Sequence, residues 1–303
     1  MRKNLWGFII LAGAFTACDS ESELPTAAFN EKAPLKIDVK ADGFEEEGTK
    51  AMFTGTSFAN NTEIGVYVLN SSGAGYDGQA TTNLKYTLSS SGWGCGKTIY
   101  LSSTTGTVYA YYPYNSSLAN PEAIAMTAST APGGGTDYMF ATANSVSLKA
   151  TTAALSMKHA LTAVKVSIKK GTYKGAGKVT ALTWTSDGAG TGGSLNAKTG
   201  AVSSVTGTGT AFNAGLTAES SYTITTTAKD YTFMAVPAGT SKALSFSVTM
   251  DGKTFTVNSA AVILGQGKLH QYILTMDAKT MTVSKVTLTD WANQTEEGLK
   301  PSF

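Results

Sequence analysis

Apolar and polar residues alternate in many short stretches of the chain. The alternation is clearest in Leu35–Lys40 (LKIDVK) and in Leu244–Met250 (LSFSVTM), where every second side chain is apolar. Successive side chains of a β-strand point to opposite faces, so this period of two predicts strands with one buried and one solvent-facing side. In the first half of the chain, no helical period extends beyond one or two turns. The pattern therefore predicts an all-β protein.

Further strands are expected between segments rich in Gly, Ser, Asn and Asp. Asp251-Gly252 predicts a hairpin turn, and Gly188–Gly193 and Gly207–Gly209 are expected to be long loops. The glycine run at Gly133–Gly135 is interpreted as a turn, because the Gly-Lys-Ser/Thr ending of a phosphate-binding loop is missing. The other expected strands are residues 64–69, 84–88, 98–101, 108–114, 137–141, 155–161, 164–168, 179–184, 222–226, 231–236, 253–257, 269–276 and 281–288.

The start of the chain has a different pattern. Arg2 and Lys3 precede an apolar run over residues 5–15, and Thr16 and Ala17 then lead to Cys18. A positive start, an apolar run of roughly ten residues and small residues before a cleavage point predict a secretory signal peptide, since a membrane span needs about 18–20 residues. The cysteine directly after the small residues is similar to a bacterial lipobox. We therefore expect Cys18 to be lipidated, and the mature protein to be an outer-membrane lipoprotein at the cell surface.

Composition narrows the class of protein. Only 15% of the residues are charged and the formal net charge is +2, so no basic surface for nucleic acid is expected. Aromatic residues make up 10% of the chain, and Thr, Ser, Gly and Ala are abundant, which is typical of extracellular β proteins with many turns. No second apolar run approaches the length of a membrane span.

Few residues are candidates for chemistry. Cys95 would have no disulfide partner once Cys18 is lipidated, and its setting favours a partly buried small side chain over a catalytic thiol. His159 and His270 lie beside strand-like sequence, which favours structural roles. Five aspartates lie mostly at turns or strand ends, where this residue commonly forms turns. They are Asp137, Asp187, Asp230, Asp251 and Asp290. Without a catalytic or metal-binding motif, we expect no enzyme activity, no cofactor and no metal.

The most aromatic segment is Val108–Tyr114 (VYAYYPY). Aromatic rings exposed on a sheet can stack on sugars, which would suit a glycan-binding surface protein. A strand whose rings are buried on both faces is the favoured interpretation, because exposed apolar patches of this size are uncommon. Pro113 indicates a sheet edge or the end of the strand.

Chain length predicts more than one domain. About 285 residues follow the signal peptide, and a single compact domain usually holds fewer. We expect residues 1–18 to be the signal peptide and residues 19–34 a flexible tether. Residues 35–150 would form an N-terminal β-sandwich and residues 151–303 a C-terminal one, with the boundary near Ser145–Ala154.

An ordered series of motifs resembles one known family. The motifs are Ile64–Tyr67 (IGVY), Tyr109–Tyr114 (YAYYPY), Asp137–Ala141 (DYMFA), Lys158–Leu161 (KHAL), Phe233–Ala238 (FMAVPA), Leu264–Lys268 (LGQGK) and Val286–Trp291 (VTLTDW). Together, behind a lipobox, they resemble the fimbrillin family, the lipoprotein-derived subunits of type V pili in Bacteroides-like bacteria. The resemblance runs from about Leu35 to Trp291. It implies two transthyretin-like Greek-key β-sandwich domains in tandem and a structural, adhesive role in a fimbria.

The resemblance also implies how such a subunit assembles. A protease cuts the exported lipoprotein after a basic residue, the first strand is lost, and the vacated groove accepts a strand from another fimbrial subunit. Here the first strand would be Leu35–Lys40, and the cut would fall between Lys50 and Ala51. Ala292–Phe303 would be the donor segment. The only arginine is Arg2, inside the signal peptide, so an arginine-specific protease has no site in the mature protein.

Two other roles stay open at this point. A subunit that is never cut would remain lipid-anchored as an anchor or accessory subunit of the fimbria. The other alternative is a monomeric cell-surface lipoprotein that binds a host or bacterial glycan or protein.

Overall fold

Almost all regular structure in the chain is β-strand. The computed structural model describes residues 31–41, 53–54, 57–217 and 219–290. Among these residues, the single helical segment is a 3-10 turn, η1 (Tyr76–Gly78). None of the described segments is a helix of the length and apolar character that crossing a membrane requires. The all-β prediction is confirmed.

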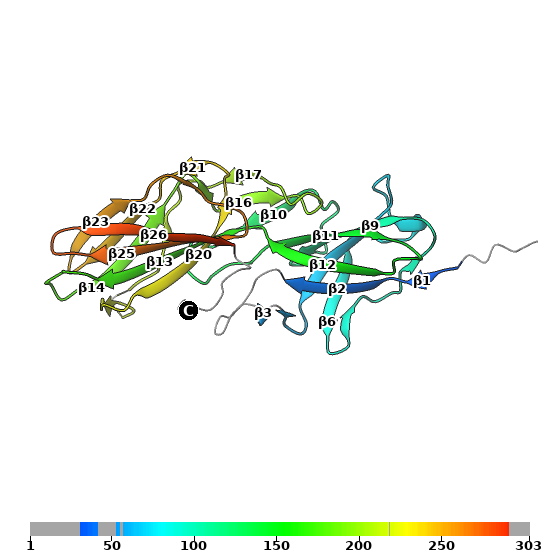
Figure 1. Cartoon of the computed structure of the whole chain (residues 1–303), viewed down its shortest axis with the longest axis horizontal. Coiled ribbons are helices and arrows are strands. Elements are labelled where there is room, and N and C mark those ends of the chain that lie inside the picture. The colour runs from blue at the N-terminus through cyan, green and yellow to red at the C-terminus, as the bar shows by residue number, and fades with distance from the viewer. Residues whose placement is uncertain (1–30, 42–52, 55–56, 218, 291–303) are drawn as a thin grey trace, which may run out of the picture. The chain divides into compact units, whose positions relative to one another are not determined.

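Seven strands form one curled sheet around a first hydrophobic core (Figure 1). In spatial order they are β2 (Lys36–Ala41), β12 (Thr152–His159), β11 (Met139–Val146), β9 (Gly106–Tyr112), β5 (Glu63–Leu69), β6 (Leu84–Ser89) and β7 (Gly92–Gly94). The two edge strands, β2 and β7, come into contact with each other. Apolar side chains at alternate positions, such as Val66 and Val68, point into the enclosed core and are fully buried.

Two five-stranded sheets enclose a second core. One contains β15 (Ala189–Gly190), β20 (Lys229–Pro237), β13 (Thr162–Lys170), β25 (Lys268–Met276) and β26 (Met281–Asp290). The other contains β18 (Phe212–Asn213), β14 (Lys178–Thr185), β22 (Ser245–Met250) and β23 (Lys253–Asn258), with β19 (Tyr222–Thr223) also paired to β14. Between them Trp184 stacks on Phe212 with ring centroids 4.2 Å apart. The hairpin predicted at Asp251-Gly252 joins β22 to β23.

A third hydrophobic cluster, called the bridging cluster here, contains residues of both halves of the chain. Its buried members are Tyr67, Leu69, Tyr111, Ile124, Met126, Ala128, Ala160, Leu161, Leu195, Ala197 and Val236. Its small sheet consists of β10 (Ile124–Thr127), β16 (Gly192–Leu195) and β17 (Val202–Thr206). These strands were not predicted, and the expected loop at Gly188–Gly193 was wrong. Gly192 and Gly193 lie against Thr206 and Val236 so closely that a Cβ atom would clash at either position. Glycine permits this close packing but has no side chain that could show a strand period.

Three short pairs complete the described strands. They are β1 (Ala33–Pro34) with β8 (Tyr100–Leu101), β3 (Phe53–Thr54) with β4 (Ser57–Phe58), and β21 (Ser241–Lys242) with β24 (Val262–Ile263). The pairing of β1 means that the last two residues of the tether expected over residues 19–34 belong to a strand. Residues 19–30 of that tether lie outside the described residues.

The chain passes from the first core to the second after strand β12. The boundary predicted near Ser145–Ala154 falls inside the β11–β12 hairpin, and both strands belong to the first sheet. Strand β12 stays there because its buried Leu155 and Met157 complete the first core. The chain then passes through Ala160 and Leu161, which belong to the bridging cluster. Two separate cores are consistent with two domains, but the division of the chain into domains stays a prediction.

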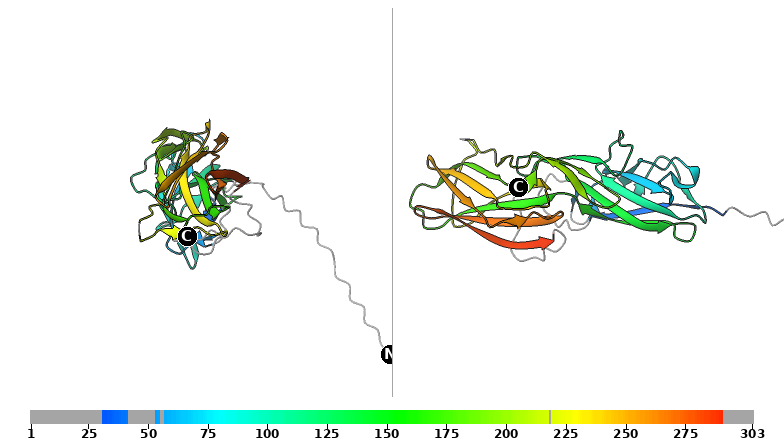
Figure 2. Two further views of the ribbon diagram at one scale, coloured as in Figure 1. Left: turned by 90° about the vertical axis from the view of Figure 1, so that its left-hand side faces the viewer. Right: turned by 90° about the horizontal axis from the view of Figure 1, so that it is seen from above.

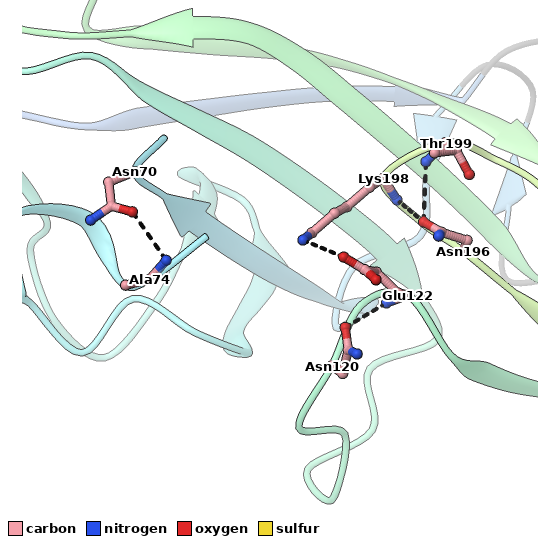
Figure 3. Close-up of polar contacts among 7 residues, drawn as sticks. All are labelled: Asn70, Ala74, Asn120, Glu122, Asn196, Lys198 and Thr199. Atoms are coloured by element: carbon pink, nitrogen blue, oxygen red, sulfur yellow. Dashed lines mark hydrogen bonds and ion pairs between the residues drawn. The ribbon is translucent and has the colours of Figure 1, made fainter. Parts of the chain in front are cut away.

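Hydrogen bonds and an ion pair of polar side chains stabilise several of the connecting turns (Figure 3). The Lys198 Nζ lies 2.6 Å from the Glu122 carboxylate, which ties the turn after β16 to the segment before β10. The side-chain oxygens of Asn70, Asn120 and Asn196 each accept backbone N–H groups two to four residues later. Such bonds satisfy backbone groups that no sheet pairs.

Gly65 is expected to be the most sensitive glycine of the first sheet. It lies opposite Tyr111 on the neighbouring strand, and the buried Tyr111 ring covers it, so a Cβ atom would overlap that ring. We expect Gly65→Ala to lower the free energy of unfolding by about 1–3 kcal/mol, because the core must shift. In the control Gly94→Ala, at the exposed position of β7, the new methyl group meets no atom and the change should stay within about 0.5 kcal/mol. Denaturant unfolding measures both, and equal effects would contradict this packing.

A buried ion pair gives a second expectation. Lys165 Nζ lies 2.7 Å from Asp230 Oδ2, and the two side chains are 3% and 16% exposed. Asp230→Ala would leave a buried ammonium without its counter-charge and should cost about 3–5 kcal/mol. The double variant Lys165→Met/Asp230→Ala should recover much of that loss. The matched control is Glu63→Ala, which breaks the half-exposed pair with Lys85 and should leave the unfolding midpoint unchanged. A similar loss in the control and the buried pair would refute the expectation.

Candidate functional site

Strand β2 lies at the edge of the first sheet. It runs parallel to β12 over six residues, with Lys36 opposite Thr152 and Ala41 opposite Met157 (Figure 1). More than a hundred residues separate the two strands in the sequence, whereas the other pairs of this sheet are antiparallel. A single cut between Ala41 and Phe53 would therefore separate β2 from every other strand of the sheet.

The side chains of β2 divide cleanly between the core and the solvent. Ile37 is 8% exposed and Ala41 3%, and with Leu35 they belong to the first core. Lys36, Asp38 and Lys40 alternate with them and are exposed. Charged residues that point outward on an edge strand discourage pairing with other chains. The intact edge is therefore closed on its inner face and protected on its outer face.

Main-chain hydrogen bonds extend the contacts of β2 beyond its paired strand. The Leu35 N–H donates to the Ile99 carbonyl at 2.8 Å, and the Lys36 N–H donates to the Thr151 carbonyl at 2.8 Å. The preceding residues, Ala33 and Pro34 of β1, pair with β8. The segment thus contributes both backbone pairing and apolar side chains to the first core.

The chain is anchored again soon after β2. Phe58, in β4, is 5% exposed, and its ring packs edge-on against Trp93 with centroids 5.5 Å apart. The centroid of the Tyr112 ring lies 6.1 Å from that of Phe58. These ring contacts hold Phe58 in the first core in addition to the contacts between β4 and β2.

Several predicted site residues lie outside the described residues. These are the lipidation site Cys18, the processing residues Lys50 and Ala51, and the donor tail Ala292–Phe303. Lys50 and Ala51 fall in the sequence between Ala41 of β2 and Phe53 of β3. The roles of all these residues stay predictions.

The structure brings two candidate residues together. His159 Nδ1 lies 2.7 Å from Asp137 Oδ2, and the side chains are only 2% and 9% exposed. The pairing of Met139 with His159 places the start of β11 beside the end of β12, which explains the contact. Solvent is nearly excluded from the pair, so it offers no open position for a substrate. It ties the hairpin together where the chain leaves the first core.

The remaining candidates occupy structural positions. His270 is fully buried, and its Nε2 accepts a hydrogen bond from the Gly265 N–H at 3.1 Å. The Asp251 carboxylate accepts from the backbone N–H groups of Gly177 and Lys178, both at 2.8 Å. These bonds lower the pKa of Asp251 from its usual value. Cys95 is half-buried and packs against the first core.

The aromatic strand is buried, as the favoured interpretation expected. It corresponds to β9, in the middle of the seven-stranded sheet, and Pro113 follows its last residue. Tyr112 points into the first core and Tyr111 into the bridging cluster, and both are at most 2% exposed. Burial raises the pKa of each of these two phenols to about 12. These rings are not available to stack on a sugar.

Within residues 31–41, 53–54, 57–217 and 219–290, we find no group of three or more His, Cys, Asp or Glu side chains that could hold a metal ion.

Asp290 ends β26, where it lies opposite Lys268 on β25. Strands β25 and β26 run side by side in the views of Figures 1 and 2. Strand β26 is thus an edge strand of its sheet, directly before the predicted donor tail.

Comparisons with known proteins agree with this architecture. A family model described as fimbrillin-like matches residues 49–291. A candidate cell adhesion protein from Bacteroides uniformis is 20% identical with a TM-score of 0.62, over 85% of this chain and 98% of that one. A second from Bacteroides ovatus is 18% identical with a TM-score of 0.61, over 88% and 100%. A fimbrial protein from Bacteroides vulgatus is 13% identical with a TM-score of 0.51, over 85% and 99%. Comparison with curated protein sequences gave no match.

Substitutions on the inner and outer faces of β2 should differ in their effect on the free energy of unfolding. Ile37→Ala removes a buried side chain and should lower the free energy of unfolding by about 2–3 kcal/mol. Lys40→Ala, on the exposed face of the same strand, is the matched control and should leave stability nearly unchanged. Denaturant unfolding of both variants measures the difference. Equal stability of Ile37→Ala and the unsubstituted protein would show that β2 does not hold the first core closed.

Proposed function

Because the chain belongs to the fimbrillin-like family, we propose that it is a structural subunit of a fimbria that joins its neighbours by exchange of a β-strand. The observation that carries the proposal is the position of β2. It is a parallel edge strand that fills part of the first core, and one cut separates it from the rest of the sheet. Removing it would expose the edge of β12 and the positions left by Leu35, Ile37 and Ala41.

Such an opening has the properties of a strand acceptor. An unpaired sheet edge offers main-chain donors and acceptors, and pockets for alternate side chains give selectivity. Each large apolar side chain that leaves the core forfeits about 1.5–3 kcal/mol of burial energy, which a neighbour's apolar strand would restore. The uncut subunit occupies its own groove, so cleavage would control the start of assembly.

The extent of the family match supports the same division of the chain. The match begins at residue 49, next to the proposed cut between Lys50 and Ala51, and it leaves out β1 and β2. On this proposal, residues 18–50 are part of the exported lipoprotein and are lost when it is cut. Lipidation of Cys18 would hold the subunit on the outer membrane until that step. The protein would act through assembly and adhesion at the cell surface, with other fimbrial subunits as its partners, and not through catalysis.

An uncut subunit that stays on its lipid as an anchor is a second candidate. The absence of arginine after Arg2 favours it, because cleavage at Lys50 needs a protease that accepts lysine. In that case β2 would remain in its groove, and the subunit could only donate a strand. The two candidates therefore differ in whether the first groove ever opens.

Controlled cleavage tests the proposal. In a variant of residues 19–303, the recognition sequence of a site-specific protease replaces residues 45–50. After cleavage and release of β2 in mild denaturant, return to native buffer should give a concentration-dependent ladder of discrete, SDS-resistant species. The uncut variant is the control and should stay monomeric.

A peptide competition makes the test specific. An excess of a peptide with the sequence of residues 33–41 should suppress the ladder, because it refills the groove. The same peptide with Ile37→Asp and Val39→Asp should not suppress it, since these side chains face the core. A cleaved protein that stays monomeric, or aggregates without discrete bands, would contradict strand exchange.

A further inference from the structure

A polar pocket opens at one end of the sheet that contains β14, β22 and β23. Its volume is about 380 Å³, within the range of small-ligand pockets, roughly 300–1,000 Å³. The polar residues that line it are Thr185, Ser186, Asp187, Ser245 and Asn258. Gly209 and Ala243 complete the lining. None of these residues takes part in the proposed exchange of β2.

Strand register explains why these residues meet. Thr185 ends β14 opposite Ser245, and Ser245 starts β22 opposite Asn258 at the end of β23. Residues that lie opposite one another share a face of a sheet, and the preceding pair, Trp184 and Phe246, fills the second core. Thr185, Ser245 and Asn258 therefore form a polar row on the outer face, at the same end of three strands.

The adjoining loop holds Asp187 beside this row. The Ser186 hydroxyl accepts the Gly188 N–H at 3.1 Å, and the Ser186 carbonyl accepts the Gly209 N–H at 3.1 Å. Gly209 has a φ of +75°, and a Cβ atom there would lie 3.0 Å from the Asp187 Oδ1. Glycine thus lets the second loop approach the carboxylate closely. Asp187 itself is exposed and can reach a bound ligand.

We propose that this pocket binds a neutral, polyhydroxylated ligand, namely one hexose unit of an uncharged glycan. Hydroxyl groups both donate and accept hydrogen bonds, and the lining offers a carboxylate acceptor, an amide that does both, and several hydroxyl groups. Among the described residues, no Lys or Arg lines the pocket, and the Asp187 carboxylate would repel an anionic sugar. The described lining also holds no aromatic ring, so binding depends on hydrogen bonds and should be about millimolar for a single sugar.

Titration of the isotope-labelled protein, residues 19–303, with neutral methyl glycosides tests the inference. The probes are the methyl glycosides of glucose, galactose, mannose and N-acetylglucosamine, and methyl sialoside is the anionic comparison. At least one neutral glycoside should cause saturable NMR shifts of the backbone amides of Asp187, Ser245 and Asn258. The sialoside should bind more weakly than that neutral glycoside.

Matched variants assign the binding to the pocket. Asp187→Ala and Asn258→Ala should each weaken the binding by tenfold or more. Thr256→Ala is the control, because Thr256 is an exposed residue of the same strand, β23, and does not line the pocket. The control should bind as the unsubstituted protein does.

Three results would overturn the inference: no saturable shift with any neutral glycoside, unchanged binding in Asp187→Ala and Asn258→Ala, or tighter binding of the sialoside. Far-UV circular dichroism of each variant confirms that loss of binding is not loss of fold. The outcome is independent of strand exchange, since the pocket and β2 share no residue.

Discussion

The backbone pairing of β12 is the constraint on which the rest of the first half depends. This strand has β11 on one side, and β2 is the one described strand that pairs with its other edge. Buried N–H and C=O groups without hydrogen bonds are costly, so something must occupy this edge whenever the core is closed. The sheet curls until β2 contacts β7, which makes β2 the strand that completes the enclosure. A segment in this position can be replaced by another strand but cannot simply be left out.

Other parts of the molecule keep the fold intact around that position. Phe58, Trp93 and Tyr112 hold the chain in the first core directly after the proposed cut. The His159–Asp137 contact ties β12 to β11, and the bridging cluster packs Tyr67 and Tyr111 with residues from the second half. None of these contacts passes through β2. These contacts therefore act in addition to those that β2 makes with β4, β7 and β12.

The fold could be predicted from the sequence wherever side chains alternate strictly. Leu35–Lys40 and Leu244–Met250 became β2 and β22 within one residue at each end, because one face is core and the other is solvent. Strand β16 could not be predicted, since glycine at positions 192 and 193 is required by close packing and has no side chain that shows a period. The sequence also did not show that β12 pairs with β2 and β11, so the position of the expected boundary within the β11–β12 hairpin could not be foreseen.

Sites whose residues meet only through the pairing register of strands far apart in the sequence were even harder to predict. Residues 185, 245 and 258 meet only because three strands end together, and Asp230 reaches Lys165 only because β20 lies beside β13. The burial of the aromatic strand was predictable, because a central strand with rings on both faces must fill two cores. The proposed cut depends on the resemblance and on the position of β2 together.

The most direct test of the account is the N-terminal residue and intact mass of this subunit in fibres sheared from the surface of its native cells. The account predicts a chain that begins at Ala51, without β1 and β2. A chain in those fibres that still begins at a lipidated Cys18 would contradict it, because the groove beside β12 would then be filled by the subunit's own strand.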